Sequence, residues 1–120
     1  MNDFKAHIPI YLQLINAIKQ FIVSGRWPPG TRVPPVRELA TQFGVNPNTM
    51  QRALLELERD GLIFTERTAG RFVTKDNDRI ANVRQELCQK VIENAIAELK
   101  NLGFTEQEAN LLLKTHHSGS

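Results

Sequence analysis

Residues 35–60 constrain the fold more than any other stretch, because they predict two short helices joined by a tight turn. Apolar residues recur there at intervals of three and four, which places them on one buried face of each helix. In the first predicted helix, at 36–43, that face carries Val36, Leu39, Ala40 and Phe43. In the second, at 47–59, it carries Met50, Ala53, Leu54 and Leu57.

The turn between these helices contains residues that end one helix and begin the next. Gly44 can adopt the left-handed conformation found at helix C-termini, and the Asn46 side chain can cap the following helix. Pro47 falls at the first helical position, where its missing N–H costs nothing. Two short helices with such a turn are typical of the helix-turn-helix unit, whose second helix reads the DNA major groove.

The segments on either side extend this unit to a winged helix. Residues 9–24 predict an amphipathic helix, and residues 25–35 hold four of the six prolines, which indicates a stiff connector. Two β-rich runs, 62–66 and 71–74, flank a turn at 67–70 and predict a hairpin, the wing. Within the connector, Trp27 is either a lid on the core or a residue that stacks on DNA, and the lid is favoured because no basic cluster lies beside it.

The C-terminal third predicts two further helices. A helix at 79–101 carries a broad apolar stripe, and a capping box at 105–108 opens a short last helix. The stripe either packs within its own chain or pairs with a second copy. The dimer is favoured, because operator recognition usually joins two half-sites by two-fold symmetry. The predicted dimerisation residues are Ile80, Val83, Leu87, Val91, Ile92, Ala95 and Leu99.

The sequence therefore predicts a mainly α fold with one small β-hairpin. A winged-helix DNA-binding domain is expected at 1–75, a two-helix dimerisation region at 76–115 and a disordered tail at 116–120. Charge agrees with this division. Residues 1–75 hold 10 Lys and Arg against 6 Asp and Glu, whereas residues 76–120 hold 5 against 7. The basic front fits a nucleic-acid partner.

Other classes of protein find little support. No run approaches the roughly 18 apolar residues of a membrane span, and a single cysteine excludes an internal disulfide, so a cytoplasmic location is expected. Cys88 lies on the apolar stripe and is interpreted as a packed thiol rather than a redox sensor. The histidines, His7, His116 and His117, lie near the termini without metal-ligand spacing. We expect no enzyme activity, no metal and no cofactor.

Seven short motifs lie in order between residues 9 and 73. They are Pro9-Ile10-Tyr11, Ser24-Gly25, Pro29-Gly30, Arg37-Glu38-Leu39-Ala40, Gly44-Val45, Asp60-Gly61-Leu62 and Gly70-Arg71-Phe72-Val73. Their order and spacing resemble the winged-helix domain of GntR-family bacterial transcription regulators. The stretch 46–49 and the short two-helix tail are similar to the YtrA-like subfamily. That resemblance implies a repressor, commonly of transporter operons, whose C-terminal part dimerises.

The chain also departs from the family pattern at four positions. Pro47 and Gln51 stand where many members carry arginines, so base contacts from those two positions cannot be carried over. Thr68 replaces the first glycine of the usual wing motif. Pro35 replaces the usual serine before the first helix of the motif, which should leave that helix without a side-chain cap.

The candidate DNA-binding residues lie on the second helix, at the start of the first helix and on the wing. The N-terminal turns of a recognition helix approach base edges most closely, and Arg, Asn and Gln side chains can read them. The predicted set is Arg37, Asn48, Thr49, Gln51, Arg52, Arg67, Thr68, Gly70 and Arg71. Two alternatives remain open: Arg52 could instead form an ion pair with Glu56, and Arg37 a surface ion pair.

These features predict a sequence-specific DNA-binding transcription regulator, a repressor that binds a palindrome-like operator as a homodimer. The alternative is a winged-helix module that binds another protein, in which case the basic face is incidental. The sequence does not indicate an effector ligand.

Overall fold

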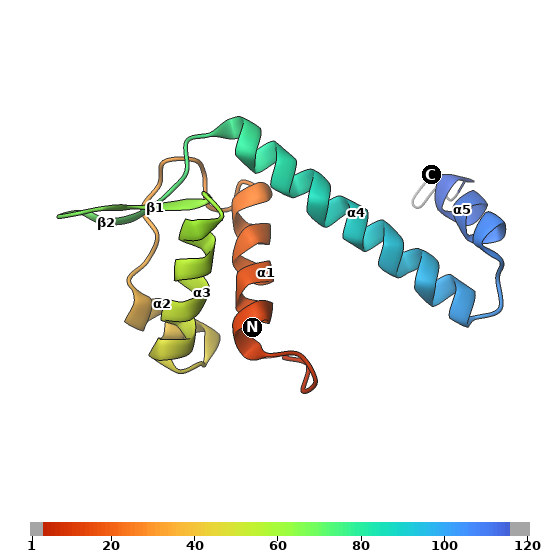
Figure 1. Cartoon of the computed structure of the whole chain (residues 1–120), viewed down its shortest axis with the longest axis horizontal. Coiled ribbons are helices and arrows are strands. Elements are labelled where there is room, and N and C mark those ends of the chain that lie inside the picture. The colour runs from red at the N-terminus through yellow and green to blue at the C-terminus, as the bar shows by residue number, and fades with distance from the viewer. Residues whose placement is uncertain (1–3, 116–120) are drawn as a thin grey trace. The chain divides into compact units, whose positions relative to one another are not determined.

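The computed structural model describes residues 4–115, which form five helices and one hairpin (Figure 1). The elements are α1 (Ile10–Val23), α2 (Val36–Phe43), α3 (Pro47–Arg59), β1 (Ile63–Glu66), β2 (Gly70–Val73), α4 (Asn77–Asn101) and α5 (Glu106–Thr115). The predicted fold class, mainly α with a small β-hairpin, is confirmed. The chain divides into two compact units between Arg84 and Gln85. The predicted tail at 116–120 lies outside the described residues.

The ends of α2 and α3 form as their residues predict. Gly44 ends α2 with a left-handed φ of 71°. The Asn46 side chain then accepts a hydrogen bond of 2.7 Å from the backbone N–H of Asn48, with Pro47 at the first position of α3. Pro35, as predicted, gives α2 no side-chain cap. Local chemistry therefore determines the helix-turn-helix geometry.

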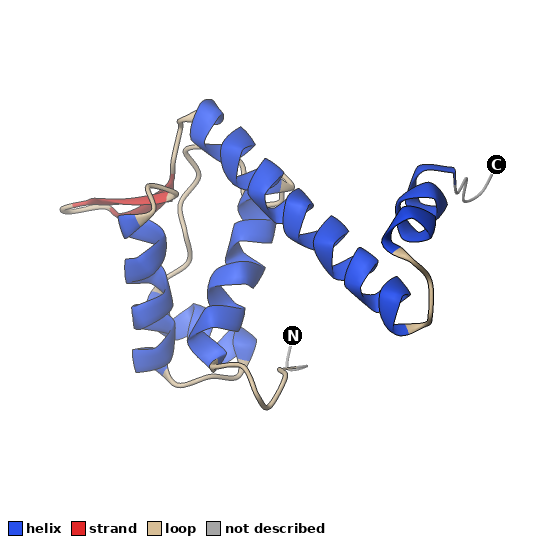
Figure 2. Ribbon diagram, turned by 45° about the vertical axis from the view of Figure 1, so that its right-hand side comes forward, coloured by secondary structure: helices blue, strands red, loops and turns tan. Residues whose placement is uncertain are grey.

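The first unit is a helical core with a hairpin that extends away from it (Figure 2). Helices α1, α2 and α3 pack their apolar faces together, and Phe43 and Leu54 are fully buried between them. Half-buried Trp27 packs its ring on Phe21 with the centroids 5.3 Å apart, so it covers the core edge as predicted. The buried core residues shared by these helices are Leu14, Ile18, Ile22, Leu39, Ala40, Phe43, Met50, Ala53, Leu54 and Leu57.

The segment before α2 does more than connect two helices, because it pairs with the wing. Strands β1 and β2 are antiparallel, with Ile63 opposite Val73 and Glu66 opposite Gly70. On the other edge of β2, the Val73 N–H donates to the Thr31 carbonyl at 2.9 Å, and the Val33 N–H donates to the Arg71 carbonyl at 2.8 Å. Residues 31–33 therefore act as a short third strand that ties the wing to the start of α2.

The beginning of α4 belongs to the first unit, not to a separate C-terminal region. Asp76 caps the helix by accepting from the N–H groups of Asp78 and Arg79. Arg79 donates to the Asp60 carbonyl, and Arg84 donates to the Val23 carbonyl. These contacts hold the first two turns of α4 on the winged helix, and the first compact unit extends to Arg84.

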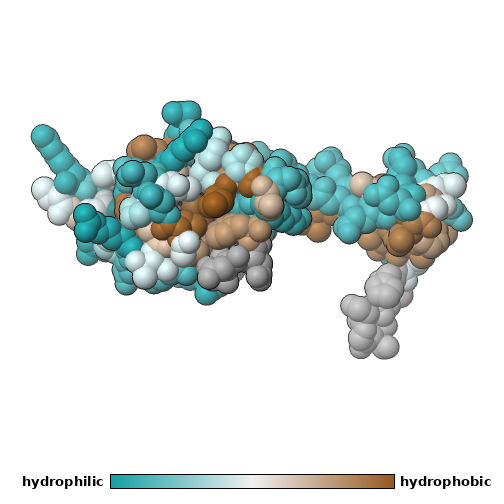
Figure 3. Space-filling view, turned by 90° about the horizontal axis from the view of Figure 1, so that it is seen from below, coloured by the Kyte–Doolittle hydropathy of each residue, from teal (hydrophilic) through white to brown (hydrophobic). Residues whose placement is uncertain are grey.

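The second unit contains the rest of α4 and α5. The predicted capping box forms at the start of α5. The Thr105 N–H donates to the Glu108 carboxylate at 2.8 Å, and the Glu108 N–H donates to the Thr105 hydroxyl at 3.1 Å. Ala109 is the fully buried residue of α5, and much apolar surface remains exposed on this unit (Figure 3). Among the described residues, no helix has the length and apolar content to cross a membrane.

Candidate nucleic-acid interface

The outward face of α3 carries the side chains predicted to read bases. Asn48, Arg52 and Leu55 are exposed there, while Thr49 and Gln51 lie half-buried at its flanks. Leu55 is 47% exposed, so no neighbouring segment of the described chain covers it. This face therefore offers two kinds of contact on a helix that can enter a major groove: polar donors and acceptors in its first half, and one apolar side chain, Leu55, in its second half.

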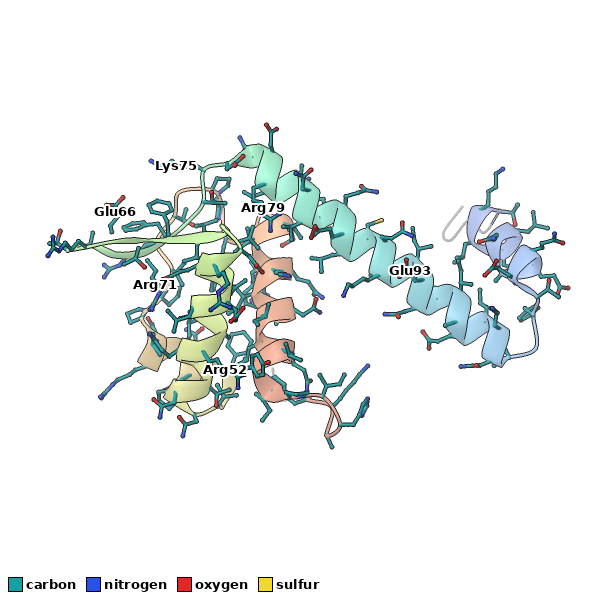
Figure 4. All side chains as sticks on the ribbon, viewed as in Figure 1. Arg52, Glu66, Arg71, Lys75, Arg79 and Glu93 are labelled. Carbon is teal, nitrogen blue, oxygen red and sulfur yellow. The ribbon has the colours of Figure 1, made fainter. Side chains whose placement is uncertain are left out.

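Arg52 does not form the alternative ion pair with Glu56. Its guanidinium instead lies over the ring of Tyr11 in α1, 3.6 Å from the centroid. Glu56 pairs with Arg59 at 3.0 Å. The side chain of Arg52 remains exposed in this arrangement, and its position on the lower half of α3 is labelled in Figure 4.

Arg37 lies exposed in the first turn of α2. No ion pair of Arg37 is found among residues 4–115, so the surface-pair alternative has no support in the described part of the chain. The hydroxyl of Thr41, one turn later, donates to the Arg37 carbonyl at 2.9 Å. The charge of Arg37 is therefore available to a phosphate group close to the helix-turn-helix.

The wing presents its predicted residues unequally. Arg67 and Thr68 are exposed at the tip, and Gly70 has a φ of 106° that favours glycine. Arg71 is less exposed than the tip residues: it is half-buried, and its Nε donates to the Glu58 carboxylate at 2.6 Å. The hydroxyl of Thr65 donates to the same carboxylate at 2.5 Å. Arg71 thus fastens the wing to α3, and much of its charge is balanced there.

The prediction missed one arginine beside the wing, Arg32. Its exposed side chain lies against Gly70, so that a Cβ added to Gly70 would meet the Arg32 Nε at 3.3 Å. Arg32, Arg67 and Arg71 line an open groove of about 290 Å³ between the wing and the start of α2. The sequence gives little indication of this position of Arg32. The β segment that contains it, residues 31–33, is too short to be predicted as a strand.

The predicted dimerisation residues also separate into two groups. Ile80 and Val83 are buried within the first unit, at 5% and 1% exposure. Leu87, Ala95 and Leu99 are half-buried, whereas Val91 and Ile92 are exposed. Cys88 is exposed too, so the expectation of a packed thiol is wrong for a single chain.

The match to a family model identifies the chain. The model described as "Bacterial regulatory proteins, gntR family" matches residues 10–73, more than half of the sequence. The chain belongs to the gntR family. The family consists of regulatory proteins rather than enzymes, and it is the family that the seven sequence motifs predicted. Among the described residues, no group of metal-binding side chains is present.

Individual members of the gntR family resemble this chain over most of its length. The HTH-type transcriptional repressor YtrA of Bacillus subtilis (strain 168) is 35% identical and covers 98% of this chain and 78% of its own. A GntR family transcriptional regulator from Listeria monocytogenes superimposes with a TM-score of 0.81 at 36% identity, covering 95% of this chain and 100% of its own. The predicted YtrA-like resemblance is therefore confirmed.

A DNA-bound structure also resembles part of this chain. The DNA-binding domain of AraR in complex with an operator superimposes with a TM-score of 0.54 at 29% identity, covering 62% of this chain and 90% of that domain. A domain that resembles this chain therefore binds an operator.

In this gntR-family chain, replacing Glu58 with Gln should loosen the wing and change the pH dependence of stability. Burial by itself raises the pKa of the Glu58 carboxyl, but the hydrogen bonds from Thr65 and Arg71 and the charge of Arg71 outweigh it. The pKa therefore lies below its ordinary value of 4.5. Because the folded pKa is depressed, this stabilisation is fully present above the unfolded pKa and is lost as the pH falls through the folded value.

We expect Glu58→Gln to lower the free energy of unfolding by about 1 kcal/mol at neutral pH. Thermal unfolding at a series of pH values should show this difference shrinking as the pH falls well below 4.5. The matched control is Glu66→Gln, an exposed glutamate of strand β1 that forms no ion pair among the described residues. A difference between Glu58→Gln and wild type that stays constant down to acidic pH would contradict this role.

Proposed function

We propose that this protein is a sequence-specific DNA-binding transcription regulator, a repressor that binds a palindrome-like operator as a homodimer. The exposed polar face of α3, flanked by exposed arginines on α2 and on the wing, carries the proposal. A winged helix with this arrangement can contact base edges and phosphates together. The DNA-bound AraR domain supports the DNA-binding part of the proposal, and the repressor YtrA supports the repressor role.

In the proposed complex, α3 enters the major groove and its first turns meet the base edges. Arg52 can form two hydrogen bonds to guanine, Asn48 or Gln51 can bind adenine, and Leu55 can contact a thymine methyl group. Thr49 lies at the groove edge, where its hydroxyl can reach a base or a phosphate. Because Pro47 has no polar side chain, the polar contacts begin one residue later, at Asn48.

The basic residues around α3 position the protein on the DNA backbone. Arg37 from α2 and Arg67 from the wing are exposed, and Arg32 adds a charge beside Gly70. The Thr68 backbone at the wing tip can donate to a phosphate. We assign Arg71 mainly to holding the wing, because its Nε already donates to Glu58.

Selection of bound sequences from a random duplex pool tests the proposal. We expect enrichment of two inverted half-sites with centres about 10 base pairs, or a multiple of that, apart. The variant carrying both Asn48→Ala and Arg52→Ala is the control and should lose the enrichment while it still binds duplexes weakly. A wild-type protein that enriches no sequence would contradict sequence-specific recognition.

The homodimer is proposed to form through apolar residues of the second unit. Val91, Ile92, Leu111 and Leu112 are exposed there at 67%, 41%, 59% and 41%. Monomers rarely expose large apolar patches, so exposed apolar side chains at this density favour an interface. The proposed dimer surface therefore consists of this set with Leu87, Ala95 and Leu99, and it excludes Ile80 and Val83, which are buried in the first unit.

Replacing Val91 with Lys should dissociate the dimer. A two-fold interface contains the substitution twice, and an unpaired buried charge is strongly destabilising, so we expect the dissociation constant to rise by about 100-fold or more. Sedimentation equilibrium at micromolar protein measures the change. Gln89→Lys, which adds the same charge on the opposite side of α4, is the control and should remain dimeric. A monomeric wild type, with and without DNA, would refute the dimer.

A further inference from the structure

The stacking of Arg52 on Tyr11 has a consequence for how the recognition helix reads DNA. Tyr11 lies in the first turn of α1, and the Arg52 guanidinium lies 3.6 Å from its ring centroid. We propose that Tyr11 is a positioning residue, which holds Arg52 in the orientation that reads a guanine. This inference rests on the proposed function and names a specificity determinant outside the helix-turn-helix.

The geometry suits this role because a guanidinium uses different parts of its surface for the two contacts. Stacking on a ring occupies the flat face of the group. Its N–H donors point outward in the plane, so they stay available for the two hydrogen bonds to guanine O6 and N7. Tyr11 can therefore restrict the long Arg52 side chain without consuming the donors that specify the base.

The acidic residues of α3 do not compete for Arg52. Glu56 pairs with Arg59 at 3.0 Å, and Glu58 accepts from Arg71 at 2.6 Å. Among the described residues, no carboxylate forms an ion pair with Arg52. Tyr11 is thus the partner that determines where the guanidinium lies in the free protein.

The ring of Tyr11 is itself held in place. It is half-buried on a helix whose next turns bury Leu14 and Ile18 in the core. The segment before α1 is fixed by Gln13, whose side-chain amide donates to the carbonyls of Lys5 and Ile8 at 2.9 and 2.8 Å. A fixed ring lowers the conformational entropy that Arg52 loses when it binds a base, which increases affinity for the matching sequence.

The test compares ring chemistry at position 11 in the full chain. The variants are Tyr11→Leu, Tyr11→Phe, pentafluorophenylalanine at 11, Arg52→Ala, and Tyr11→Leu combined with Arg52→Ala. Each is titrated against the selected operator, against every single-base-pair change in one half-site and against a nonspecific duplex. Leu12→Ala, an exposed neighbour in the same turn of α1, is the matched control and should behave as wild type.

We expect Tyr11→Leu to weaken operator binding by about two- to fivefold per half-site. The loss should appear as reduced discrimination at the base pair that Arg52→Ala also affects. Tyr11→Phe should retain wild-type preference, because the ring carries the effect. Pentafluorophenylalanine keeps the shape of the ring but reverses its charge distribution, so it should behave like Leu even if Tyr11→Leu folds poorly. In the Arg52→Ala background, Tyr11→Leu should have no further effect.

The inference would be overturned by equal losses on operator and nonspecific duplex, by a Tyr11→Phe defect as large as that of Leu, or by a full Tyr11→Leu effect without Arg52. The second result would assign the role to the hydroxyl group, as in a phosphate contact. Unchanged preference in all position-11 variants would refute the inference alone. A wild-type protein that selects no duplex would refute the proposed function and the inference with it.

Discussion

Binding of this protein to its operator should weaken by about 10³- to 10⁴-fold between roughly 50 and 200 mM salt. Arg32, Arg37 and Arg67 are exposed around the recognition helix, and Arg52 adds a fourth charge on it. A dimer would then neutralise about six to eight phosphates, each of which contributes roughly −0.9 to the slope of log K against log salt. Fluorescence anisotropy titrations at several salt concentrations measure this slope.

Single variants should change the slope in proportion to the number of phosphates that the dimer no longer neutralises. Arg37→Gln and Arg67→Gln should each reduce its magnitude by about 2, because each removes one phosphate-binding charge from both subunits. Lys114→Gln removes the same charge from α5, outside the winged helix, and should leave the slope unchanged. A flat salt response of the wild type would instead favour a protein-interaction module, the alternative that the sequence left open.

The second large effect is expected in the core of the first unit. Leu54→Ala should lower the free energy of unfolding by about 2–5 kcal/mol, because it leaves a cavity where a Leu side chain is fully buried. Urea denaturation followed by circular dichroism measures the loss. If Leu54→Ala costs no more than a surface substitution, the packing of α3 described for this unit is incorrect.

Its matched control is the next residue, Leu55→Ala, which removes the same atoms from a side chain that is 47% exposed. That change should alter stability by no more than about 0.5 kcal/mol. It should nevertheless weaken operator binding if Leu55 contacts a thymine methyl group. The pair thus separates the buried face of α3 from the face that is proposed to meet DNA.

The sequence predicted those elements whose signals are local. The bounds of α2 and α3 agree with the expectation at both ends, because Gly44, Asn46 and Pro47 mark the turn chemically. The capping box at Thr105 and Glu108 is likewise a four-residue pattern. The observed bounds of the two wing strands differ from the predicted bounds by one residue, because the Gly-containing turn allows more than one register.

Pairings between distant residues escaped prediction for a physical reason. Arg52 contacts Tyr11, which lies 41 positions earlier in the sequence. Arg71 contacts Glu58, which lies 13 positions earlier. The packing of the helices determines which distant side chains meet, and the periodicity of the sequence does not reveal that packing. The stripe on α4 shows the same limit. Periodicity identified its apolar face but not that Ile80 and Val83 cover the first unit while Val91 stays exposed.

The pairing of residues 31–33 with β2 joins the wing to α2 through Pro34 and Pro35. Both prolines have fixed φ angles, so the span from wing strand to helix has little freedom to stretch or rotate. The distance between the wing arginines and Arg37 is consequently fixed. On the proposed function, a bound duplex would have to match that separation with its own groove width, and we expect DNA shape to contribute to recognition at base pairs that no side chain touches.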